Sequence, residues 1–131
     1  MKKILFVDAS ASKELAASVK DLINSPGREV FYAVKESEVH QWLRNNKIDT
    51  VILEPVYPAD YLLSEKEVDQ SFLTGAGLVL YKNIIKLSKA KIILRTTQTL
   101  ESLVEAGFPT DSKHIGKPGL ISELIDMLEE A

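Results

Sequence analysis

Short apolar runs that end at polar residues recur along the chain. The run Val51–Leu53 follows Thr50 and stops at Glu54 and Pro55. A continuous apolar run of this length is typical of a central strand that is buried on both faces. Glu54 is then expected at the carboxyl edge of a sheet, where open α/β folds place their sites.

Four other segments share this strand pattern, and segments with apolar residues at helical spacing separate them. The five strands are expected at Ile4–Val7, Glu29–Val34, Thr50–Leu53, Lys91–Thr96 and Lys113–Gly116. The five helices are expected between Leu15 and Ile23, at Ser37–Asn46, from Gly77 to Leu87, at Thr99–Glu105 and at Leu120–Glu130. This alternation predicts an α/β fold with a doubly wound parallel sheet. The commonest order for five such strands is 2-1-3-4-5, as in flavodoxin-like proteins.

The length and composition predict a single domain over residues 1–131, with an extended loop around residues 56–76. Its apolar residues are candidates for an unusual contact surface: Tyr57, Tyr61, Leu62, Leu63 and Phe72. The formal net charge of -3 gives no reason to expect a nucleic acid or an anionic membrane as partner. The chain has no cysteine and no apolar run near the ~20 residues of a membrane span. A cytoplasmic location is expected.

Polar side chains are expected to converge where neighbouring strands end. In the order 2-1-3-4-5, the strands that end at Asp8 and Glu54 lie side by side at the switch point. Thr96 and Lys117 follow the next two strands. Two carboxylates, a hydroxyl and an ammonium can hold a phosphoryl group together with a divalent cation. The same residues can instead form a buried ion pair between Glu54 and Lys117, and Thr96 with Thr97 can simply cap the next helix.

Four segments together resemble the receiver domain of two-component response regulators, the CheY-like family: ILFVDAS, TVILEPVYP, IILRTT and HIGKP. The resemblance covers nearly the whole chain. It implies a flavodoxin-like fold, Mg²⁺-dependent phosphotransfer from a histidine kinase to an aspartate, and no enzymatic turnover of its own. It also implies output to a downstream effector, or homodimerisation, through the fourth helix, fifth strand and fifth helix.

Two departures from the family pattern fall in the pocket. By motif, Glu54 stands at the position of the phosphoaccepting aspartate, and Ala9 stands at the position of an acid that ligates Mg²⁺. Asp8, Thr96 and Lys117 match the family, whereas His114 stands where the switch aromatic usually stands. Because glutamate is one methylene longer and proximity effects fail over about 1 Å, phosphotransfer is not expected. Mg²⁺ binding at Asp8 and Glu54 is expected to be weak or absent, and no cofactor is expected.

The sequence therefore predicts a degenerate receiver, or pseudo-receiver, that acts as a phosphorylation-independent protein-interaction module in two-component or phosphorelay signalling. Two alternatives remain open. One is a receiver with residual phosphoacceptor activity at Glu54 or Asp8. The other is a small flavodoxin-like binder of a nucleotide or flavin, although the loops after Asp8 and Thr96 lack a glycine-rich phosphate cradle.

Overall fold

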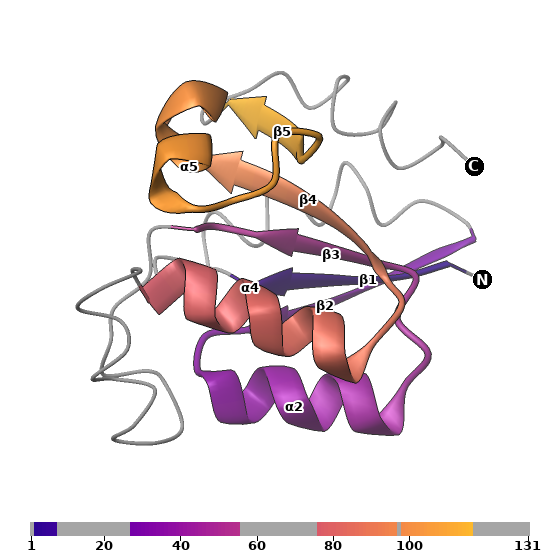
Figure 1. Cartoon of the computed structure of the whole chain (residues 1–131). Coiled ribbons are helices and arrows are strands. Elements are labelled where there is room, and N and C mark those ends of the chain that lie inside the picture. The colour runs from indigo at the N-terminus through magenta and orange to yellow at the C-terminus, as the bar shows by residue number, and fades with distance from the viewer. Residues whose placement is uncertain (1, 8–26, 56–75, 97, 117–131) are drawn as a thin grey trace.

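The computed structural model describes residues 2–7, 27–55, 76–96 and 98–116 (Figure 1). The strands are β1 (Lys2–Val7), β2 (Arg28–Ala33), β3 (Thr50–Leu53), β4 (Lys91–Thr96) and β5 (Lys113–Gly116), and the helices are α2 (Glu36–Asn45), α4 (Ala76–Leu87) and α5 (Leu100–Ala106). All five strands and three helices therefore lie within two residues of their predicted bounds. The helices predicted near the two ends of the chain and the extended loop fall outside the described residues.

The five strands form one parallel sheet in the order β2-β1-β3-β4-β5, which confirms the predicted topology. β1 lies between β2 and β3, and its apolar residues fit that central place because Leu5 and Val7 are fully buried. In the register between β3 and β4, Leu53 pairs with Leu94. All carboxyl ends therefore meet at one edge of the sheet, as the prediction of a site there requires.

Both faces of the sheet are buried. On one face, Leu5, Val51 and Leu94 share a core cluster with residues of α2, α4 and α5, and α2 and α4 lie side by side in front of the sheet in Figure 1. The opposite face carries the alternate residues of the same strands, and these are also buried: Ile4, Phe6, Ile52 and Ile93. Continuous apolar strands with two buried faces are the pattern expected of a parallel sheet.

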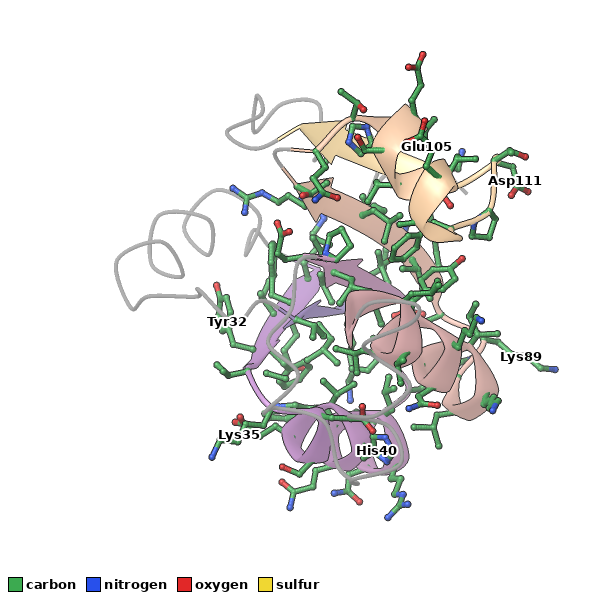
Figure 2. The ribbon with its side chains drawn as sticks, turned by 60° about the vertical axis from the view of Figure 1, so that its left-hand side comes forward. Tyr32, Lys35, His40, Lys89, Glu105 and Asp111 are labelled. Carbon is green, nitrogen blue, oxygen red and sulfur yellow. The ribbon has the colours of Figure 1, made fainter. Side chains whose placement is uncertain are left out.

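Helix α2 begins where the chain turns at Lys35, labelled in Figure 2. The Glu38 carboxylate accepts hydrogen bonds from the backbone N–H groups of Val34 and Lys35, at 3.3 and 3.0 Å. This side chain therefore satisfies the N–H of the N-cap residue Lys35 and that of Val34 before it. Trp42 holds the other side of the helix to the sheet, because its indole N–H donates to the Tyr32 carbonyl at 3.1 Å.

Helix α5 is capped by Thr99, not by Thr96 as one sequence interpretation suggested. The Thr99 hydroxyl accepts from the Ser102 N–H at 3.1 Å. The helix ends at Gly107, whose φ of +114° is the left-handed conformation that favours glycine. Thr96 lies three residues before the cap, so its side chain is available to the edge of the sheet.

Helix α4 approaches the end of β3 at a glycine. A Cβ on Gly77 would lie 2.9 Å from the Cα of Pro55 and closer still to its carbonyl group. Only glycine allows this approach of the helix to the backbone that follows Glu54. Among the described residues, no helix is long and apolar enough to cross a membrane.

Candidate functional site

Glu54 lies at the carboxyl end of β3, as predicted, and only 8% of its surface is exposed. Its backbone N–H donates to the Val7 carbonyl at 2.9 Å, which joins the ends of β1 and β3. The hydrogen bond fixes the Glu54 backbone beside the last residue of β1. Asp8, the predicted companion carboxylate, follows Val7 in the sequence but lies outside the described residues, as do Ala9 and Lys117.

Thr96 ends β4 at the same edge and is completely buried. Its hydroxyl oxygen accepts a hydrogen bond from the Gln98 N–H at 3.2 Å. Thr96 therefore closes a short turn directly after the strand, a common use of this side chain. The hydroxyl hydrogen remains able to donate to an acceptor at the sheet edge.

His114 contacts the same turn from β5. Its Nε2 lies 3.0 Å from the Gln98 carbonyl oxygen. Because a carbonyl only accepts, this contact requires a hydrogen on Nε2. Gln98 is therefore held on both sides, through its N–H by Thr96 and through its carbonyl by His114, and the predicted hydroxyl and switch positions meet at one backbone unit.

Arg95 is a buried charged residue that the sequence analysis did not single out. It is 8% exposed and pairs with Ile115 in the register of β4 and β5. Arg95 follows Leu94, the last β4 residue that pairs with β3, just as Glu54 follows Leu53. The structure contains no ion pair between these two described residues. The charged residue in the apolar run KIILRT could have pointed to it, since arginine is rarely fully buried unless it is paired.

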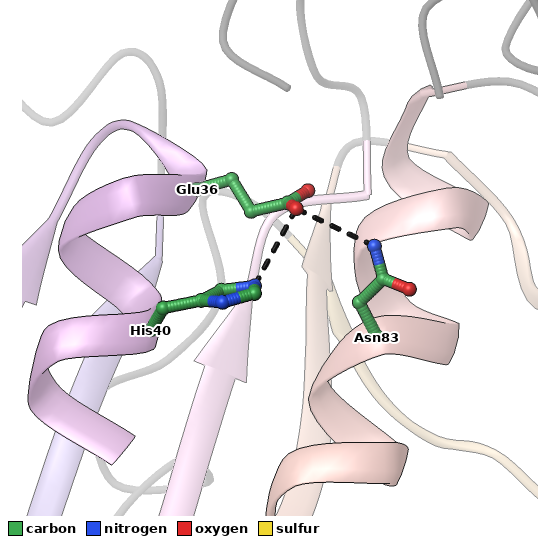
Figure 3. Close-up of polar contacts among 3 residues, drawn as sticks. All are labelled: Glu36, His40 and Asn83. Atoms are coloured by element: carbon green, nitrogen blue, oxygen red, sulfur yellow. Dashed lines mark hydrogen bonds and ion pairs between the residues drawn. The ribbon is translucent and has the colours of Figure 1, made fainter. Parts of the chain in front are cut away.

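A second buried carboxylate belongs to Glu36, at the first residue of α2 (Figure 3). It is fully buried. Its Oε1 lies 3.4 Å from His40 Nε2 and accepts from Asn83 Nδ2 at 3.4 Å. The contact with Asn83 joins α2 to α4, whereas His40 lies on α2 itself. The i,i+4 spacing of Glu36 and His40 could have indicated the first contact from the sequence, whereas the contact with Asn83 needs the packing of the two helices.

The described residues contain no group of three or more potential metal ligands among His, Cys, Asp and Glu side chains. Asp8, the predicted partner of Glu54 in a weak Mg²⁺ site, lies outside the described residues. The cation site therefore stays a prediction.

The chain thus has a parallel sheet in the order β2-β1-β3-β4-β5, with Glu54 buried after the central strand and Thr96 buried at the end of the next strand. Solved structures with this fold cover nearly the whole chain. A two-component response regulator from Clostridium difficile matches with a TM-score of 0.74 and 20% identity, over 98% of this chain and 93% of that one. The receiver domain of the Francisella response regulator 1452 matches with a TM-score of 0.70 and 20% identity, over the same shares of the two chains.

A third solved structure is the Vibrio cholerae chemotaxis protein CheY4, with a TM-score of 0.66 and 21% identity over 98% of this chain and 97% of that one. No protein-family model and no curated protein matches the sequence. The predicted resemblance to receiver domains is thus confirmed for the fold. At this level of identity, the likeness shows the fold alone, and function has to be argued from the site.

Proposed function

We propose that the chain is an atypical receiver domain that acts in two-component or phosphorelay signalling through protein contacts, without phosphorylation. The observation that carries this proposal is Glu54, a buried glutamate at the end of the central strand. By the resemblance of TVILEPVYP to receiver domains, this position corresponds to that of the phosphoaccepting aspartate. A side chain one methylene longer, with its backbone fixed by a hydrogen bond to Val7, cannot present its carboxylate at the same point.

The surroundings of Glu54 support a pocket that works without a metal ion. Ala9 stands where the resemblance implies a metal-ligating acid. Hard divalent cations require several oxygen ligands, so the loss of one weakens the site.

The turn after β4 supports a switch that is held in one state. Thr96 and His114 both hydrogen-bond the backbone of Gln98. A threonine that moves toward a phosphoryl group has to break its existing hydrogen bonds. Here the hydrogen bond that the Thr96 hydroxyl accepts from the Gln98 N–H opposes such a movement. The proposed partners are therefore signalling proteins, a histidine kinase or a downstream effector, that bind a constant surface. We propose no catalytic turnover for the chain.

The test is the intact mass of the purified protein after incubation with Mg²⁺ and acetyl phosphate. The parent is expected to gain no phosphate, whereas a variant with Ala9→Asp and Glu54→Asp is expected to form a phosphate adduct. A matched control with Ala9→Asp and Glu54→Asn restores the metal ligand but has no acceptor at position 54, so it should stay unmodified. A phosphate adduct on the parent would overturn the proposal and favour the alternative of residual phosphoacceptor activity.

The binder of a nucleotide or flavin remains the other alternative. Only the fold class favours it, since parallel α/β sheets bind such ligands at the switch point. The purified protein is expected to be colourless and to show no change in melting temperature with added nucleotide or flavin. A clear thermal shift with either ligand would favour this alternative instead.

A further inference from the structure

A pocket of about 300 Å³ lies between the C-terminal ends of α2 and α4. It is lined by the last turn of α2 and by the loops that lead from α2 to β3 (residues 46–49) and from α4 to β4 (residues 88–90). Figure 1 shows the two helices ending at the same end of the molecule. Both loops lead into the amino ends of strands, so the pocket lies at the edge of the sheet opposite Glu54. Its volume is at the lower end of the range of small-molecule sites.

Hydrogen bonds fix the walls of this pocket. The Asp49 carboxylate accepts from the Lys3 N–H at 2.8 Å, and the Ser88 hydroxyl oxygen accepts from the Ala90 N–H at 3.1 Å. The Ser88 N–H donates to the Ile84 carbonyl at 3.0 Å, which ties the loop after α4 to the helix. A pocket with fixed walls is pre-formed, so a ligand can bind without first ordering the chain.

The lining combines apolar side chains with hydrogen-bond donors. Leu43 and Ile48 line the pocket and are buried, with 9% and 5% of their surfaces exposed. The Ser88 hydroxyl uses its oxygen within the loop, which leaves its hydrogen able to donate to a ligand. Lys47 and Lys89 line the pocket from the two loops and are exposed. A fitting ligand therefore has an apolar part and an acceptor group.

The charges around the pocket leave a surplus of positive charge. Neither Lys47 nor Lys89 forms an ion pair within the described part of the chain. Helix C-termini carry about half a negative charge each, but Arg44 and Lys86 in the last turns of α2 and α4 offset them. Asp49 is the one carboxylate in the described lining. Two ammonium groups against one carboxylate leave one positive charge, which favours an anion.

We propose that this pocket binds a small organic anion, with a carboxylate or phosphate group on a short apolar chain. Lys47, Lys89 and the Ser88 hydroxyl bind the anionic group. The apolar chain packs on Leu43 and Ile48. Figure 2 shows the Lys89 side chain extending away from the end of α4, and its flexible stem lets the ammonium turn over the pocket when an anion is present.

The occupant is a small molecule rather than a segment of another protein. The large apolar side chains exposed in the described part of the chain are Ile85 and Leu87, and neither lines the pocket. A protein segment binds stably through a cluster of apolar contacts, whereas a small molecule needs only the pocket. The proposal goes beyond the proposed function and does not depend on it, because the pocket is far from the edge that holds Glu54 and needs no phosphoryl group there.

The test is a titration of the nitrogen-15-labelled chain, followed through its backbone amide signals by NMR. The probes share a butyl chain: pentanoate and butyl phosphate carry an anionic group, butylammonium carries a cationic one and butanol is neutral. Sodium chloride keeps the ionic strength constant, because salt screens exposed charges. The two anions are expected to shift the amides of residues 46–49 and 88–90 with a dissociation constant of about 1 mM, a weak value that suits exposed lysines. Butanol and butylammonium should cause no saturable shift.

Variants at the two lysines test which groups bind the anion. Lys47→Gln and Lys89→Gln should each raise the dissociation constant about threefold, and the double variant about tenfold, because an exposed charge contact is worth a factor of roughly two to five. Lys82→Gln is the control, since it removes the same charge from an exposed position of α4 that does not line the pocket. It should leave binding unchanged. The remaining amide signals of each variant check the fold.

Three results would overturn the proposal. They are no saturable shift at residues 46–49 and 88–90 with either anion, a double variant that binds as tightly as the parent, and butanol that binds as tightly as pentanoate. A saturable shift with one of the two anions supports the proposal and identifies the anionic group. None of these measurements uses a phosphodonor, so each outcome leaves the proposed function untouched.

Discussion

Gly77→Ala is expected to destabilise the protein, although alanine is the better helix former. Gly77 is the second residue of α4, and an added Cβ would lie 2.5 Å from the carbonyl carbon of Pro55. Ordinary contact begins at 3.4 Å and the Pro55 carbonyl oxygen would lie closer still, so backbone atoms must separate by more than about 0.9 Å. The neighbour is main chain, not the end of a flexible side chain, and it cannot turn aside.

The magnitude follows from two opposed effects. Alanine gains about 1 kcal/mol over glycine inside a helix. Overpacking against a fixed neighbour costs about 3 kcal/mol, the upper part of its usual range. The net loss is therefore about 2 kcal/mol in the free energy of unfolding, which corresponds to about 7 °C in melting temperature for a chain of this size.

Thermal and urea unfolding measure this loss. The matched control is the pair Lys82→Ala and Lys82→Gly, at an exposed position of the same helix, which should show the ordinary preference for alanine. Hydrogen exchange gives a second readout, since the Glu54 N–H bonded to Val7 should exchange faster in Gly77→Ala. A Gly77→Ala protein as stable as the parent would refute the close approach of α4 to Pro55.

Three further predictions concern single side chains. Thr99→Ala removes the cap of α5 and should cost about 1 kcal/mol in urea unfolding, with Thr99→Ser as the variant that retains it. Glu36→Ala leaves the α2–α4 contact without its acceptor and should cost about 2 kcal/mol, whereas Glu36→Gln still accepts from Asn83 and should cost less. A loss in Glu36→Gln as large as in Glu36→Ala would contradict this account of the contact. Burial raises the pKa of Tyr81, so the folded chain keeps the phenolic proton at a pH where the unfolded chain, with a pKa near 10.0, has released it. Its contribution to stability is full below pH 10 and is lost as pH rises through the raised pKa. Urea unfolding on either side of pH 10 should show this fall in the parent and a smaller one in Tyr81→Phe.

The strands could be predicted closely because their signal is local. A parallel sheet buried on both faces needs continuous apolar runs, and β4 and β5 were located to the residue. The helix bounds were less certain by one or two residues, since several residues can cap. In the structure, Thr99 caps α5 and Thr96 does not. Only Thr99 directly precedes the first turn, where its side-chain oxygen can reach the Ser102 N–H.

The site could be predicted in part. The positions of Glu54 and Thr96 follow from strand ends and topology, and the structure places both at the carboxyl edge. The shared contact of Thr96 and His114 with Gln98 depends on how one turn folds, which no periodicity encodes. Arg95 was missed for a related reason: a charged residue in an apolar run does not reveal whether the fold buries it, as it does here. Asp8, Ala9 and Lys117 stay predictions, because they lie outside the described residues.

The central place of β1 has a consequence for how the chain folds. Its partners come later in the sequence: Ile4 pairs with Val30 on one side and with Thr50 on the other. During synthesis, β1 leaves the ribosome before β2 and β3, so it must wait for β2 and then for β3 before both sides are covered. Because such non-local pairings slow folding and leave strand edges exposed, β1 is the segment most in need of protection in the growing chain.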